Sequence, residues 1–182
     1  MITNFISPTN IQQIPDTEFV TIPWVNLPYC IGKNSLAMTD QPLYTISGLW
    51  MERFRSKTNQ IWTTGYDIPQ LSNDISGISL RVNINRAARI QDLIIQLTLG
   101  GELIGHNYAF DMTTEYAYMH NIPLVGDYNV YGGSTDMWGT ELTAMDLADP
   151  TFGAVLSFQS NETLPHRDLA YINQIAIQVN YR

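Results

Sequence analysis

The sequence predicts an all-β fold, a single antiparallel β-sandwich with at most a short helix. Apolar and polar residues alternate with a period of two in several runs, which is typical of strands with one buried and one solvated face. Helix patterns are scarce, and short strand-like runs are bounded by Pro, Gly, Asn or Asp. With 182 residues, 45% hydrophobic and 14% charged, the chain can bury one core as a single domain.

Strands are expected along most of the chain. Short ones are predicted at 19–24, 43–47 and 61–64. In the clearest strand, four aliphatic residues share one face and polar residues share the other: Ile78, Leu80, Val82 and Ile84 alternate with Ser79, Arg81, Asn83 and Asn85. The next strand runs from Leu93 to Leu99 and stops at Gly100-Gly101. We expect these two strands to be neighbours.

The last third of the chain predicts a glycine turn, a short helix and two further strands. Within Tyr131-Gly-Gly-Ser-Thr-Asp-Met-Trp-Gly139, we expect Trp138 to pack on the core, with ligand stacking as the alternative. Thr143 and Asp146 have the spacing of a helix cap, which predicts one or two helical turns before Pro150. Strands are expected in the runs 152–158 and 174–181.

Residues 1–16 differ from the sandwich domain predicted at 17–182. They contain Pro8 and Pro15 and show little periodicity, which predicts an extended N-terminal arm. Its apolar side chains, which include Phe5, Ile6 and Ile11, are expected to lie across a neighbouring subunit and to become ordered on binding.

Composition excludes several classes of function. The net charge of −8 gives no general field for binding phosphates, so direct contact with nucleic acid is not expected. No run approaches the ~18 apolar residues of a membrane span, and no signal peptide is recognisable. The single Cys30 cannot form an intramolecular disulfide, and we expect it to be buried and inert.

Catalytic and metal-binding patterns are also missing from the sequence. The three histidines are scattered, and no nucleophile elbow or phosphate-binding loop is present. Several acids between Asp127 and Asp149 could hold calcium, but they lack the spacing of an EF-hand. We therefore predict a protein without cofactor, metal or enzymatic activity.

The segment 108–131 is long, aromatic and weakly patterned. We consider intersubunit contact, ordinary packing and glycan stacking for its aromatic residues, because loops carry the recognition surfaces of sandwiches and Tyr supplies rigid contact area. The tyrosines expected to bind a partner are Tyr116, Tyr118, Tyr128 and Tyr131.

Three runs of the sequence together resemble small jelly-roll proteins of tailed-bacteriophage virions. They are Ile68 to Asn85, Ile95 to Asn107, and Gly132-Gly133 through Trp138-Gly139 and Phe152-Gly153 to the final strand. Such jelly rolls serve as capsid decoration or cement proteins, as neck and tail accessories, and as terminal modules of fibres. The resemblance implies a jelly-roll sandwich without catalytic residues.

From the resemblance we expect an accessory structural protein of a phage virion, made in the host cytoplasm. It would decorate or cement the capsid, contact other virion proteins such as the major capsid protein, and form a homo-oligomer. The alternative is a carbohydrate-binding receptor-recognition module at a tail fibre or tail tip.

Overall fold

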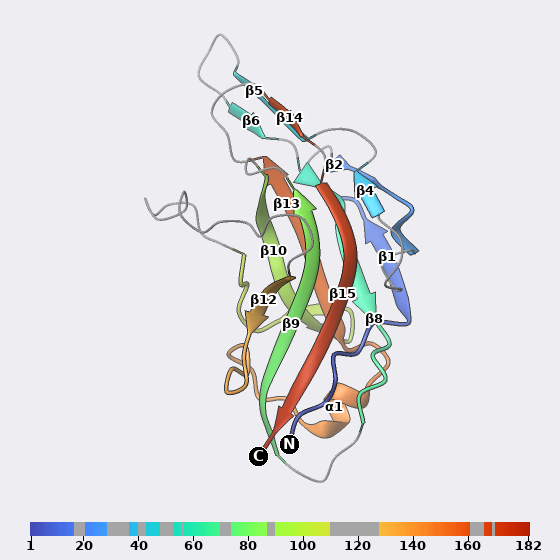
Figure 1. The fold of residues 1–182 in the computed structure, drawn as a ribbon, viewed down its shortest axis with the longest axis vertical. Coiled ribbons are helices and arrows are strands. Elements are labelled where there is room, and N and C mark those ends of the chain that lie inside the picture. Colours follow the sequence, from blue (N-terminus) through green and yellow to red (C-terminus); the bar gives the residue numbers. More distant parts are fainter. Residues whose placement is uncertain are drawn as a thin grey trace.

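A computed structural model describes residues 1–16, 21–28, 37–39, 43–47, 53–55, 57–69, 74–86, 90–109, 128–160, 166–168 and 170–182. The chain is mostly β, as predicted, and its two larger sheets lie face to face (Figure 1). Cys30, Tyr116, Tyr118 and His120 lie outside the described residues, so the predictions for them stay open.

One layer is a seven-stranded sheet. Its main path is β1 (Asn10–Ile14), β8 (Gln60–Thr64), β13 (Gly153–Ser160), β10 (Ile90–Leu99) and β11 (Glu102–Ile104). The short strands β2 (Thr21–Ile22) and β7 (Lys57–Thr58) join it beside β13 and pair in parallel. The other described pairs in this sheet are antiparallel.

The facing layer is a five-stranded antiparallel sheet. Its order is β12 (Tyr128–Gly132), β9 (Ile75–Arg86), β15 (Ala170–Tyr181), β4 (Ala37–Thr39) and β3 (Trp24–Val25). A small third sheet contains β14 (His166–Asp168), β5 (Leu43–Ser47) and β6 (Arg53–Arg55). It lies at the end of the molecule opposite the two termini (Figure 1).

The core lies between the two larger sheets, because each sheet turns its aliphatic face inward. Most of the fully buried residues of this core come from β9, β15, β10 and β13; they include Ile78, Leu80, Val82, Ile175, Ile177, Val179, Ile95, Leu97, Leu156 and Phe158. These are the faces that the period-two pattern predicts. Burial of such side chains at about 25 cal/mol per Å² is the main force that holds the layers together.

The predicted pairing of the two strongest strands is wrong. β9 pairs with β12 and β15, whereas β10 pairs with β11 and β13 in the opposite layer. Periodicity identifies which face of a strand is buried, and it does so equally for strands that pair and for strands that face each other across a core. The turn at Gly100-Gly101 does form a hairpin, in which Leu99 pairs with Glu102 and both glycines have positive φ.

The N-terminal segment pairs with its own chain in both layers. Along residues 1–7, Thr3 N donates to Val179 O at 2.9 Å, and Ile6 exchanges both backbone hydrogen bonds with Ile177. After the buried Pro8, β1 pairs with β8 in the opposite sheet. Residues 1–14 therefore run along an edge of one sheet and then an edge of the other.

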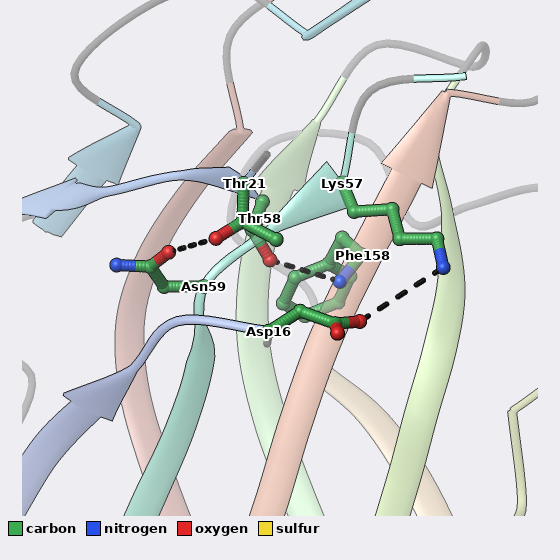
Figure 2. A network of polar contacts seen from close by, with 6 residues as sticks. All are labelled: Asp16, Thr21, Lys57, Thr58, Asn59 and Phe158. Atoms are coloured by element: carbon green, nitrogen blue, oxygen red, sulfur yellow. Dashed lines mark hydrogen bonds and ion pairs between the residues drawn. The ribbon is translucent and has the colours of Figure 1, made fainter. Parts of the chain in front are cut away.

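A polar cluster fixes the chain where β1 ends and β7 begins (Figure 2). Thr58 Oγ1 accepts a hydrogen bond from Phe158 N at 3.1 Å, and the Thr21 hydroxyl donates to Asn59 Oδ1. Lys57 Nζ lies 4.0 Å from Asp16 Oδ2. These contacts satisfy polar groups at this point of the chain.

The predicted helix is present as α1 (Ala144–Ala148). Thr143 accepts a hydrogen bond from Asp146 N, and the Asp146 carboxylate accepts one from Thr143 N, which makes the reciprocal capping box. The Asp146 carboxylate also accepts a hydrogen bond from the Thr143 hydroxyl, and this bond together with the one from Thr143 N holds the pKa of Asp146 below its ordinary value. Among the described residues, no helix has the length and apolar character needed to cross a bilayer.

Candidate functional site

The edge strand β12 presents two apolar side chains to solvent. Its register with β9 places Tyr128 opposite Asn83 and Val130 opposite Arg81, so these residues share the outer face of the five-stranded sheet. Val130 is 57% exposed and Tyr128 is 39% exposed. Isolated apolar side chains at a surface are ordinary, but these two lie beside the charged side chain of Arg81.

Arg81 lies between two aromatic rings on this outer face. Its guanidinium carbon is 4.0 Å from the centroid of Phe5 and 4.4 Å from the centroid of Tyr128. The two rings come from opposite directions, because Phe5 belongs to the N-terminal segment beside β15 and Tyr128 belongs to β12. A cation stacked on aromatic faces is stabilised by about 0.5–1 kcal/mol per contact at exposed sites.

Small and amide side chains support this stack from below. Ala176 pairs with Arg81 across the sheet and is fully buried, so its single methyl group leaves room for the larger side chains above it. Gln174 accepts a hydrogen bond from the Tyr128 hydroxyl at 2.8 Å and donates to Ser7 Oγ at 3.3 Å. We call Phe5, Arg81, Tyr128, Gln174 and Ser7 the Arg81 cluster.

The polar edge of Arg81 has no partner within the described chain. Its Nε is buried without a hydrogen bond, and no hydrogen bond or ion pair joins Arg81 to another described residue. Two rings pack against the guanidinium and its Nε is buried, so the edge formed by its two Nη groups is what a further molecule can reach. That edge is a fork of donors that fits a carboxylate or a carbonyl oxygen.

Three other predicted partner-binding residues that the structure describes have intramolecular positions. Ile6 and Ile11 are half-buried and pack against the core. Tyr131 lies on the inner face of β12 opposite Leu80, and its hydroxyl donates to Asp92 Oδ2 at 3.0 Å. Of the predicted residues, the described surface brings together Phe5 and Tyr128, and partner contact by the others remains a prediction.

Sequence reasoning placed Arg81 correctly on the polar face of its strand but assigned it no role. The available signal was weak: one arginine among Ser, Asn and Asn on that face. Its two aromatic neighbours come from the first residues of the chain and from the strand after residue 127, so only the tertiary structure reveals the stack.

Trp138 is an internal anchor, as the sequence predicts. Its side chain is fully buried, its Nε1 donates to Ile78 O at 2.9 Å, and its ring meets Tyr108 edge to face at 4.6 Å. The Tyr108 hydroxyl donates to Asp136, and burial together with this carboxylate raises the pKa of Tyr108 to about 12. The indole ring is therefore not available for stacking on a ligand.

Glycine makes the close approach to Trp138 possible. Gly132 has φ +72°, and a Cβ added there would lie 2.3 Å from Ile78 O and 2.5 Å from Trp138 Nε1. Both distances are far below van der Waals contact, and a residue with a side chain would also be strained at this φ. Gly132 thus serves packing.

Three of the four described acids that the sequence offers for calcium have local hydrogen-bond partners, and the fourth, Glu141, is exposed. Asp136 accepts hydrogen bonds from Trp138 N and from the Tyr108 hydroxyl, Asp146 completes the helix cap, and Asp149 accepts from Thr151. Over the described part of the chain, no three metal-binding side chains gather in one place.

No family model, curated protein or solved structure matches this chain. Inferences about its function therefore rest on the residues and on their geometry.

Proposed function

We propose that this chain is a non-enzymatic structural subunit of a tailed-phage particle that decorates or cements the capsid. The observation that carries the proposal is the Arg81 cluster, a pre-ordered patch of arginine and aromatic side chains on the outer face of a sheet. Together with the exposed Val130 on the adjacent edge strand, it is suited to binding a neighbouring protein surface.

Energetic considerations favour a protein partner at this patch. Arginine and tyrosine are among the residue types that contribute most to protein interfaces. Ordering a long side chain on binding costs about 0.5–1.5 kcal/mol, and Arg81 is already held between its two rings before any partner arrives. A small outer patch of this kind can therefore contribute more affinity than its area suggests.

We further propose that the sandwich is a jelly roll, as the resemblance implies. A jelly roll is a long antiparallel hairpin rolled up, so the first of eight strands pairs with the last, the second with the seventh, and so on inward. Eight strands follow this rule: β4 pairs with β15, β8 with β13, β9 with β12, and β10 with β11. Contacts of β15 with β9 and of β13 with β10 complete two four-stranded layers.

This strand order supports the fold that the resemblance implies, but one fold serves many functions. The role in the particle therefore depends on the outer patch and on the resemblance, and it needs a direct test. Glycan recognition at a fibre tip would use exposed ring faces, whereas Phe5 and Tyr128 each turn a ring face to Arg81.

The test is electron microscopy of intact phage particles in which this chain is tagged or labelled with immunogold. Many copies distributed over the head would support decoration or cementing of the capsid. A few copies confined to the tail or its fibres would refute that role and favour receptor recognition. Complete absence from purified particles would refute the proposal as a whole.

A further inference from the structure

The donors of Arg81 set the chemistry of what the cluster binds. Phe5 and Tyr128 pack against the guanidinium and its Nε is buried, so a further group can bind only along the edge formed by the two Nη groups. A carboxylate matches this fork with two parallel hydrogen bonds. A net charge of −8 disfavours a nucleic-acid phosphate at the same position.

The chain itself carries carboxylates in excess, with 17 acidic residues against 9 basic ones. Four of the acids are exposed and form no side-chain hydrogen bond or ion pair with a described residue: Asp67, Asp74, Glu102 and Glu141. One of them, Asp74, immediately precedes β9, the strand that carries Arg81. A second copy of the chain thus offers the group that Arg81 lacks.

We propose that the Arg81 cluster is a self-association site, where the guanidinium binds a carboxylate of a second copy of this chain. The inference deepens the proposed function, on which it rests, by naming the partner at the same patch. In a two-fold pair each copy would supply one arginine and one carboxylate, so that the contact forms twice. Tyr128 and Val130 would add apolar area beside each ion pair.

The test is sedimentation velocity of the purified full chain over a range of concentrations, without any phage particle. Arg81→Met keeps an unbranched apolar side chain between the rings and removes every donor. We expect it to weaken self-association by about 30-fold or more, since it would leave a carboxylate without its partner. Arg81→Lys keeps the charge but loses the planar fork, and should also weaken association.

Lys57→Gln is the matched control, because it removes one positive charge at a residue that already pairs with Asp16. It should self-associate like the wild type. Circular dichroism checks that each variant is folded.

A wild-type protein that stays monomeric at all concentrations overturns the inference, as does a folded Arg81→Met variant that associates like the wild type. Equal weakening by Lys57→Gln and Arg81→Met also overturns it, because net charge would then explain the effect. These outcomes are independent of the labelling experiment: a monomeric chain found all over the phage head refutes the self-association site and leaves the decoration role intact.

Discussion

Gly132→Ala should destabilise the fold much more than an alanine at another glycine with similar φ. The new Cβ would lie 2.3 Å from Ile78 O and 2.5 Å from Trp138 Nε1. Holding alanine at a left-handed φ costs about 1–2 kcal/mol, and relieving overpacking in a filled core costs about 1–3 kcal/mol. We therefore expect a loss of about 2–5 kcal/mol from the free energy of unfolding.

Gly100→Ala is the matched control for that substitution. Gly100 has φ +65°, close to the +72° of Gly132, but a Cβ added there meets no atom within 4 Å. Its cost should be the backbone strain alone, about 1–2 kcal/mol. The difference between the two variants isolates the contact with the buried indole and its hydrogen bond to Ile78 O.

Urea unfolding followed by far-ultraviolet circular dichroism measures both variants on one scale. Tryptophan fluorescence should report the same transition if the loop around Trp138 unfolds with the sandwich. If the two alanine variants differ by less than about 0.5 kcal/mol, the loop adapts to the added methyl group, and the anchoring role assigned to Trp138 is mistaken.

The remaining predictions concern the N-terminus, the helix cap, the alkaline range and the aromatic segment. Deleting residues 1–7 should lower the urea midpoint, because it exposes an edge of β15. An unchanged midpoint would mean that this pairing does not contribute to the stability of the fold. Thr143→Ala should cost about 1 kcal/mol in urea unfolding through loss of the helix cap, and no loss would contradict that role. The pKa of Tyr108 is about 12 in the folded chain and ordinarily 10, so the protonated hydroxyl stabilises the fold below pH 10 and this contribution is lost as the pH rises to 12. Tyr108→Phe should therefore lose less stability over this range, measured as urea midpoints from pH 9 to 12. A pH profile identical to that of the wild type would refute the assignment. Combined Tyr116→Ala and Tyr118→Ala changes should weaken incorporation into particles while the monomer stays folded, and normal incorporation would remove these residues from the interface.

The sequence predicts local features of this molecule well because they depend on residues close together in the chain. Period-two alternation locates the buried faces of β9 and β15, and the spacing of Thr143 and Asp146 identifies the helix cap. The choice of strand partners depends on long-range closure, which local periodicity does not encode. For this reason the sequence does not predict that β9 and β10, which are close in sequence, lie in opposite layers.

The candidate site shows the same division. Tyr128 could be predicted as a binding residue because aromatic side chains beside a loop often serve recognition. Arg81 could not, because its importance comes from two rings that belong to distant parts of the chain. Tyr131, three residues after Tyr128, has the opposite orientation in the strand, and its hydroxyl is bonded to Asp92 on the facing sheet.

The N-terminal segment links fold and surface, so deletion alone cannot reveal what it does. Its backbone completes an edge of β15, while the ring of Phe5 covers one face of Arg81. A truncated chain would lose both contacts, and weaker binding to a neighbour could follow from either loss. Replacing Phe5 with Leu keeps the backbone pairing and much of the apolar volume but removes the aromatic face, so a binding defect without a stability defect in that variant must arise at the Arg81 cluster.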